Sequence, residues 1–309
     1  MNYLDPKNDL VFKRVFGEHP HILRSFLNSL LPLDEHQEII SLQYLPVELV
    51  PELPSILKNT LVDVRCTDNY GRQFIVEMQM LWTDSFTNRV LFNASKAYIK
   101  QLDKGIEYKG LQPVYALSIV NEIFDKESNS WYHHYKLVHL ENKEKTLEGL
   151  QLIFVELPKY KAKNYKEKKL NALWLRYLYE LENTPDMISE DLLSVPEIAE
   201  AVELSKSSGY TKAQLEAYDK YWDSIRIEKT FIADAEARGI EEGLIKGKIE
   251  GKIEGKIEGK IEGKIEGKIE GKIERELEMA KSLLKYGKMT IDEIAEVTGI
   301  SVDELKNLK

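Results

Sequence analysis

Residues 61–80, LVDVRCTDNYGRQFIVEMQM, predict a β-hairpin. In its second half, apolar side chains alternate with polar ones, so Glu77 and Gln79 fall on one face of a strand. Residues 61–66 are typical of a second strand, and the polar, glycine-containing segment 67–71 predicts the turn between them. One strand of this hairpin therefore carries a carboxylate and an amide side by side.

The hairpin brings a second carboxylate close to the first. A turn centred on Tyr70 pairs Asp63 directly with Glu77 across the two antiparallel strands. Like charges that face each other across strands destabilise a sheet, and a divalent cation removes that repulsion. Magnesium binds one or two carboxylates together with water and phosphate oxygens. The pattern fits either such a metal site or a solvated strand face with ordinary surface groups.

The composition is that of a globular protein without a general attraction to nucleic acid. The chain has 309 residues, of which 43% are hydrophobic, and a net charge of −9. No apolar run approaches the roughly 20 residues that span a bilayer, and the N-terminus lacks the pattern of a signal peptide. Cys66 is the only cysteine, which excludes an intrachain disulfide. These features predict a cytoplasmic protein whose contacts with DNA depend on a local basic surface.

The chain divides into three parts. Residues 1–235 have mixed, globular composition, 236–274 carry the repeat GKIE, and 275–309 form a short tail of helical character. In a helix the repeat places like charges four residues apart and adds a glycine every fourth position, and both features are destabilising. We expect a helix that is marginal alone and acts as a spacer or an oligomerisation arm.

Secondary-structure patterns in the first part predict a mixed sheet flanked by helices. Asp5 is placed to cap a helix that ends before Pro32, and Thr83 to cap another that ends at Gly105, with further helices from about residue 164. Strands are predicted at 39–49, 61–66, 72–80, 113–120, 131–140 and 150–157. This order of elements indicates an α/β domain.

The tail contains two predicted capping boxes. Thr290 is followed three residues later by Glu293, and Ser301 by Glu304, while Gly299 ends the first of the two helices. The acidic character of the pair argues against direct reading of DNA. The tail is therefore interpreted as a small protein-contact module.

The hairpin and its surroundings resemble a known nuclease core. Asp63, followed by a strand that carries EMQ at 77–79, resembles the active site of the PD-(D/E)XK nuclease superfamily. The segment DPKNDLVFKRVFG, residues 5–17, is similar to the opening of one branch, the Rpn family of recombination-promoting nucleases, also called PD-(D/E)XK nuclease family transposases. A helix that holds Arg89 and Tyr98 and a C-terminal repeat rich in Lys, Glu and Gly also resemble that branch.

The resemblance carries expectations about fold and chemistry. It implies a restriction-endonuclease-like core over residues 1 to about 235 and a Mg²⁺-dependent DNA endonuclease linked to recombination or mobile elements. Other divalent cations are alternatives to magnesium. The metal ligands that it implies are Asp63, Glu77 and the backbone carbonyl of Met78, with Asp9 of the first helix as a further candidate. Asp9 also fits an ordinary charge in the first turn of a helix.

Gln79 departs from the superfamily pattern, which has Lys at this position. An amide is neither a cation nor a general base, although it can orient a water molecule by hydrogen bonds. Two functions stay open as a result. One is an endonuclease with Asp63, Glu77 and Gln79 as its catalytic residues. The other is a non-catalytic, oligomeric interaction protein on a degenerate nuclease scaffold.

Basic residues mark two candidate contacts with DNA. Arg89 and Lys96 lie on the predicted helix after the hairpin. The segment PKYKAKNYKEKK, residues 158–169, combines lysines for phosphate contacts with two tyrosines for stacking, and its candidates are Lys159, Lys161 and Lys163. A solvated linker into a helix is the alternative interpretation of this segment.

Overall fold

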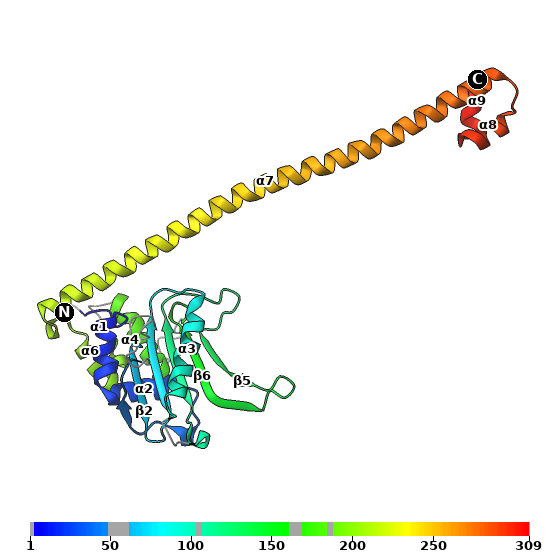
Figure 1. Ribbon diagram of the computed structural model, residues 1–309. Helices are drawn as coiled ribbons and strands as arrows, with labels where there is room; N and C mark the ends of the chain where they lie inside the picture. The colour runs from blue at the N-terminus through cyan, green and yellow to red at the C-terminus, as the bar shows by residue number, and fades with distance from the viewer. Residues whose placement is uncertain (1–2, 49–61, 103–106, 161–168, 184–187, 309) are drawn as a thin grey trace, which may run out of the picture. The chain divides into compact units, whose positions relative to one another are not determined.

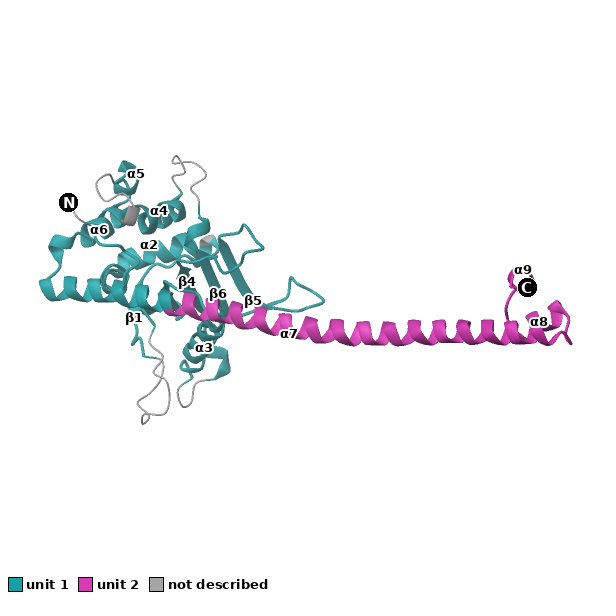
Figure 2. Ribbon diagram, turned by 90° about the horizontal axis from the view of Figure 1, so that it is seen from above, with its two compact units in different colours: residues 1–230 teal, residues 231–309 magenta. Residues whose placement is uncertain are grey.

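The computed structural model describes residues 3–48, 62–102, 107–160, 169–183 and 188–308. The chain divides into two compact units, residues 1–230 and 231–309, which are described separately and coloured differently in Figure 2. No helix within the described ranges combines the length and the apolar character that crossing a membrane requires.

A six-stranded mixed sheet forms the centre of the first unit (Figure 1). The strand order is β1-β2-β3-β4-β6-β5, with β3, β4 and β6 parallel and the other pairs antiparallel. The strands are β1 Leu42–Tyr44, β2 Val64–Asp68, β3 Gln73–Gln79, β4 Val114–Val120, β5 Tyr132–Val138 and β6 Thr146–Glu156. Helices flank this sheet, so the fold class predicted from the sequence is confirmed.

The β2–β3 hairpin has the register that the sequence predicts. Val64 pairs with Val76 in the antiparallel ladder. Continued by one position, this register sets Asp63, the residue before β2, opposite Glu77. The turn is therefore centred on Tyr70, as predicted.

Within the described residues, the first strand of the hairpin is shifted toward the C-terminus relative to the prediction. β2 covers Val64–Asp68 rather than 61–66, and position 61 lies outside the described residues. The Asp68 carboxylate closes the turn, because its Oδ1 accepts a hydrogen bond from the backbone N–H of Arg72 at 2.9 Å. Gly71 has a φ of 81°, in the left-handed region that favours glycine.

One face of the sheet is covered by α3, Ser85–Ile99 (Figure 1). The predicted cap at Thr83 is wrong, since Asp84 holds the N-cap position without a side-chain hydrogen bond and the Thr83 hydroxyl lies 3.2 Å from that of Ser85. The helix also ends before the predicted Gly105. The core between helix and sheet contains Ile75, Phe86, Val90, Ala94, Ala97, Val114, Ala116, Val120, Leu152 and Phe154.

Helices α2, α4 and α6 pack together on the other side of the sheet (Figures 1 and 2). Aromatic rings fill this layer: the Phe16 ring centre lies 4.6 Å from that of Phe26 and 5.7 Å from that of Trp174. The helices are α2 Pro20–Leu30, α4 Leu170–Asn183, the short α5 Glu190–Leu193 and α6 Pro196–Leu204. From Leu170 on, the predicted helical character is confirmed.

The first helical segment is interrupted rather than continuous. α1 is Asp9–Phe12, and Asn8, not Asp5, caps it by accepting a hydrogen bond from the backbone N–H of Leu10. A π-helical turn, η1, follows at Lys13–Gly17, and α2 begins after it at Pro20. Proline lacks the N–H that a helix interior requires, so the prediction of one helix through this region is wrong. π-helical turns often occur at functional sites.

The strand predicted at 39–49 is reduced to the three residues Leu42–Tyr44, and position 49 lies outside the described residues. The predictions at 113–120, 131–140 and 150–157 are confirmed as β4, β5 and β6, although β6 begins earlier, at Thr146.

The second unit consists of three helical segments. α7, Lys212–Tyr286, gives its first turns to the first unit, and from Phe231 on it belongs to the second. The GKIE repeat is helical, as predicted, and its isoleucines are between 51% and 55% exposed, so none of them is packed within the unit.

The end of α7 packs against two short helices. α8, Ile291–Thr298, and α9, Val302–Asn307, both begin with the predicted capping boxes. Gly299 ends α8 with a φ of 72°. The small core that these segments share contains Ala280, Ile294 and Leu305.

Candidate active site

Asp63 and Glu77 lie next to each other at the open end of the β2–β3 hairpin. Asp63 precedes β2, and its Oδ2 accepts a hydrogen bond from the backbone N–H of Met78 at 2.7 Å. Glu77 stands opposite in β3 and is only 6% exposed. The hairpin register determines this arrangement, because a slip by one residue would turn Glu77 to the other face of the sheet.

The Asp63 carboxyl group has a raised pKa. Burial is the main cause, and it raises the pKa of Asp63 from 3.8 to about 6. The N–H of Met78 and the charges of Lys13 and Arg89 act in the opposite direction, while the negative charge of Asp9 adds to the rise in pKa.

The pKa of Glu77 is also raised, again mainly by burial. A hydrogen bond from Asn93 and the charge of Arg89 lower it, and the charge of Asp63 raises it further. The charge of Asp63 therefore opposes the ionisation of the buried Glu77, and a cation stabilises two carboxylates placed in this way.

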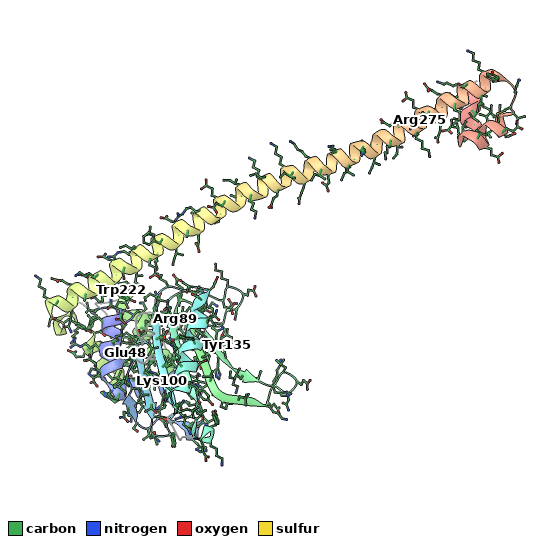
Figure 3. All side chains as sticks on the ribbon, viewed as in Figure 1. Glu48, Arg89, Lys100, Tyr135, Trp222 and Arg275 are labelled. Atoms are coloured by element: carbon green, nitrogen blue, oxygen red, sulfur yellow. The ribbon has the colours of Figure 1, made fainter. Side chains whose placement is uncertain are left out.

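Two side chains of α3, about one helical turn apart, contact Glu77. Asn93 Nδ2 donates to Glu77 Oε1 at 3.0 Å, and the Asn93 side chain is buried. Its Oδ1 is also buried and has no hydrogen-bond partner among the described residues. Arg89, labelled in Figure 3, lies with Nη2 3.8 Å from Glu77 Oε2.

Gln79 is held by protein groups at both ends of its amide. Its Oε1 accepts a hydrogen bond from Arg89 Nη2 at 2.6 Å, and its Nε2 donates to the carbonyl of Leu81. The amide therefore fixes a guanidinium beside Glu77. The positive charge that a lysine would bring to this position comes from the neighbouring helix.

The first helical segment approaches the same site. Asp9 is close enough to Asp63 to affect its pKa, and Lys13 is paired with Asp9 at 2.7 Å. Asp9 was predicted from the sequence as a candidate ligand, whereas Lys13 was not predicted. The spacing of four residues between them on one helix face was the available signal.

Tyr221 near the start of α7 also lies by the site. Burial raises the pKa of its hydroxyl, and the charges of Asp9 and Asp63 add to that effect. Nothing in the local sequence marks this tyrosine, because only the tertiary fold brings α7 to the hairpin. Asn93 was missed as well, although it lies four residues after Arg89 on the same helix.

The basic residues that were predicted to contact DNA have different surroundings in the structure. Lys96 Nζ lies 4.2 Å from the centre of the Phe92 ring on α3. Lys159 is mostly buried, and its ammonium binds Glu156 Oε2 at 2.5 Å and the carbonyl of Ser128 at 2.7 Å. It therefore secures a loop rather than facing a ligand. Lys161 and Lys163 lie outside the described residues.

The residues present fit a cation that needs few protein ligands. Among the described residues, no three His, Cys, Asp or Glu side chains form a cluster that could hold a metal. Two carboxylates suffice for magnesium, which keeps several water ligands. The unpaired, buried Asn93 oxygen beside Glu77 is a free acceptor for such water. The Met78 carbonyl stays a predicted ligand.

One comparison with known proteins identifies the family of this chain. A family described as PD-(D/E)XK nuclease family transposase matches residues 6–235, which include the whole hairpin, α3 and the start of α7. Nucleases of the PD-(D/E)XK type generally use divalent metals. The search of curated proteins found no match to the chain, and neither did the search of solved structures. The family match confirms the resemblance seen in the sequence, and the chain belongs to the PD-(D/E)XK nuclease family transposases.

Proposed function

We propose that this protein is a divalent-metal-dependent DNA endonuclease that hydrolyses phosphodiester bonds in recombination or in the movement of mobile elements. The observation that carries the proposal is the pair of carboxylates formed by the half-buried Asp63 and the buried Glu77, which stand opposite each other across the hairpin beside the Arg89 guanidinium. A scaffold function alone gives no reason to hold two carboxylates next to each other where burial raises the pKa of both.

Asp63 and Glu77 are the proposed ligands for Mg²⁺, with the Met78 carbonyl beside them and Asp9 as a further candidate. Held by these residues, a divalent cation would lower the pKa of a bound water and would stabilise charge on the scissile phosphate. Asn93 orients the Glu77 carboxylate through its hydrogen bond, in the way that second-layer groups hold metal ligands.

Arg89 and Gln79 together take the place of the superfamily lysine. The guanidinium offers several N–H donors to a phosphate, and the hydrogen bond that it donates to the Gln79 amide oxygen holds it in position. The predicted role of Gln79 in orienting water requires that its amide release Arg89 or Leu81, since both ends of the amide are engaged.

The proposal is tested by a nicking assay on supercoiled plasmid over a range of Mg²⁺ concentrations. Wild-type protein should nick the plasmid, and Asp63→Asn and Glu77→Gln should each remove the activity while the circular dichroism spectrum stays native. Glu141→Gln, which changes an exposed carboxylate in the β5–β6 connection, is the matched control and should cleave normally. Nicking that persists in both site variants would place the active site elsewhere.

A non-catalytic interaction protein is the second candidate. The absence of a lysine at position 79 and the row of half-exposed isoleucines along α7 favour it. In this case, wild-type protein would bind without nicking at any concentration of Mg²⁺ or Mn²⁺. The GKIE repeat is then the proposed route to a homo-oligomer, which light scattering on the eluting protein would detect.

The proposed organisation of the chain follows the three parts of the sequence. Residues 1–235 form the nuclease domain, with a helical subdomain from about residue 164. Residues 236–274 are a helical spacer, and 275–309 are a contact module for another protein.

A further inference from the structure

A solvent-open cleft of about 630 Å³ lies between the first helical segment and the start of α7. One wall comes from α1 and η1 and includes Asp9, Lys13 and Arg14. The other comes from the first turns of α7 and includes Lys220 and Tyr221. All of these residues belong to the first unit.

The cleft is a local basic surface on an acidic chain. Three basic side chains and two acidic ones, Asp9 and Glu18, line it, whereas the whole chain has a net charge of −9. Nucleic-acid contacts depend on such local excess of positive charge. Lys220 is exposed, so its ammonium can reach a phosphate without rearrangement of the core.

Arg14 is held in place by the cleft itself. Its Nη1 donates to the carbonyl of Gly209 at 2.7 Å, and its guanidinium lies 4.2 Å from the centre of the Tyr210 ring. Arginine has five N–H donors in a planar fork, so these contacts orient the group and leave donor capacity for a phosphate.

Lys13 is paired only weakly in the free protein. Its ion pair with Asp9 is 2.7 Å long, but the two side chains are 47% and 44% exposed. Exposed ion pairs of this kind contribute about 0–1 kcal/mol. A phosphate therefore replaces Asp9 as the partner of Lys13 at little cost.

The cleft leads to the candidate active site. Asp9 in one wall adds to the rise in the pKa of Asp63 that burial causes. Asp63 in turn adds to the rise in the pKa of Tyr221, again after burial, so the opposite wall is near the same carboxylate. The geometry agrees, because η1, which forms part of one wall, also contacts β2, the strand that begins directly after Asp63.

We propose that this cleft binds the phosphodiester backbone of the DNA strand that enters the active site, with Lys13, Arg14 and Lys220 as its phosphate contacts. The inference rests on the proposed endonuclease function, because the strand in the cleft is the one to be cleaved.

The test measures DNA binding without metal, so that cleavage plays no part. Fluorescein-labelled single-stranded and duplex DNA of the same sequence are titrated with full-length protein in EDTA, and anisotropy gives Kd at several salt concentrations. The variants are Lys220→Gln and the double variant Lys13→Gln/Lys220→Gln. Lys229→Gln is the matched control, because nine residues correspond to about two and a half turns and place Lys229 on the opposite face of α7.

Lys220→Gln should weaken binding on the order of 10-fold at low salt and reduce the slope of log Kd against log salt by about 0.9 for duplex or about 0.7 for single-stranded DNA. The double variant should roughly double the loss of slope. Lys229→Gln should bind as wild type does. The form of DNA with the larger effect is the form that occupies the cleft.

The proposal is overturned if wild-type protein binds neither form of DNA, or if Lys220→Gln binds as tightly as Lys229→Gln. The plasmid assay separates this result from the proposed function. If wild type nicks the plasmid and Lys220→Gln binds DNA unchanged, the proposed DNA-binding role of the cleft is wrong and the proposed nuclease activity stands. If Lys220→Gln binds DNA more weakly but wild type never nicks the plasmid, the proposed nuclease activity is wrong and the DNA-binding role of the cleft stands.

Discussion

The ionised form of the Asp63 carboxyl group is unfavourable in the folded protein at neutral pH. Its folded-state pKa of about 6 lies above the ordinary value of 3.8, so the folded protein holds the proton more tightly than the unfolded chain does. The stability that protonation confers is fully present below 3.8 and is lost as pH rises through about 6. Ionisable groups whose burial destabilises the folded protein in this way are often found at functional sites.

Replacing this carboxylate by its amide should therefore stabilise the metal-free protein. At pH 8, Asp63→Asn should raise the free energy of unfolding of the first unit by about 3 kcal/mol, since one pKa unit corresponds to about 1.4 kcal/mol. The asparagine oxygen can still accept the Met78 N–H. Urea denaturation in EDTA at pH 4 and pH 8 measures the difference, which should shrink at pH 4. Equal stability of the two proteins at pH 8 would show that Asp63 is well solvated.

Arg89 and Gln79 give a second prediction at this scale. Arg89→Ala should slow nicking by on the order of 10²-fold, as expected for loss of a positioned donor. Gln79→Lys alone should help little, because the lysine would lie beside the Arg89 guanidinium. In the Arg89→Ala background, however, Gln79→Lys should recover much of the rate. Initial nicking rates of the four proteins decide the matter, and a double variant no faster than Arg89→Ala would contradict it.

At the scale of elements, the hairpin could be predicted and the first helical segment could not. Alternation along 72–80 and a polar turn determine a register locally, and the observed pairing of Val64 with Val76 agrees with it. In the first segment, apolar spacing continues across Pro20, although the backbone breaks there into a π-helical turn and a new helix. Apolar periodicity reports the buried face and does not register a local change of helix type.

Some residues of the candidate site could be predicted from the sequence, and others could not. Asp63, Glu77 and Gln79 belong to one hairpin, so local pattern and resemblance indicate them together. Asn93 and Tyr221 reach the site only through the packing of α3 and α7, which no local pattern encodes.

The repeat within α7 offers a prediction about helix stability. The glycines at 255, 259 and 263 have open space where a Cβ would lie, so alanine fits at each of them. Each change should favour the helix by nearly 1 kcal/mol. Hydrogen exchange, followed by mass spectrometry of peptides from the repeat, should slow in the triple alanine variant. Gly287→Ala is the contrasting control, because a φ of 68° disfavours alanine and exchange nearby should become faster. Unchanged exchange in the triple variant would mean that glycine does not limit this helix.

In the molecule as a whole, the family match and the first compact unit cover nearly the same residues. We therefore expect the nuclease activity to reside in that part of the chain. The match ends at residue 235 and the first unit at Thr230. A protein truncated after residue 235 should therefore keep the Mg²⁺-dependent nicking rate of the full chain. Circular dichroism and thermal unfolding check that it is folded. A folded but inactive truncated protein would assign part of the activity to the repeat or the tail.

We propose above all that Asp63 and Glu77 together bind one divalent cation. Isothermal titration calorimetry of Mg²⁺ and Mn²⁺ into the metal-free protein tests it most directly. We expect one equivalent to bind to wild type and to Glu141→Gln, and binding to be lost in both Asp63→Asn and Glu77→Gln. Undiminished binding of one equivalent by Glu77→Gln would show that Glu77 is not a metal ligand.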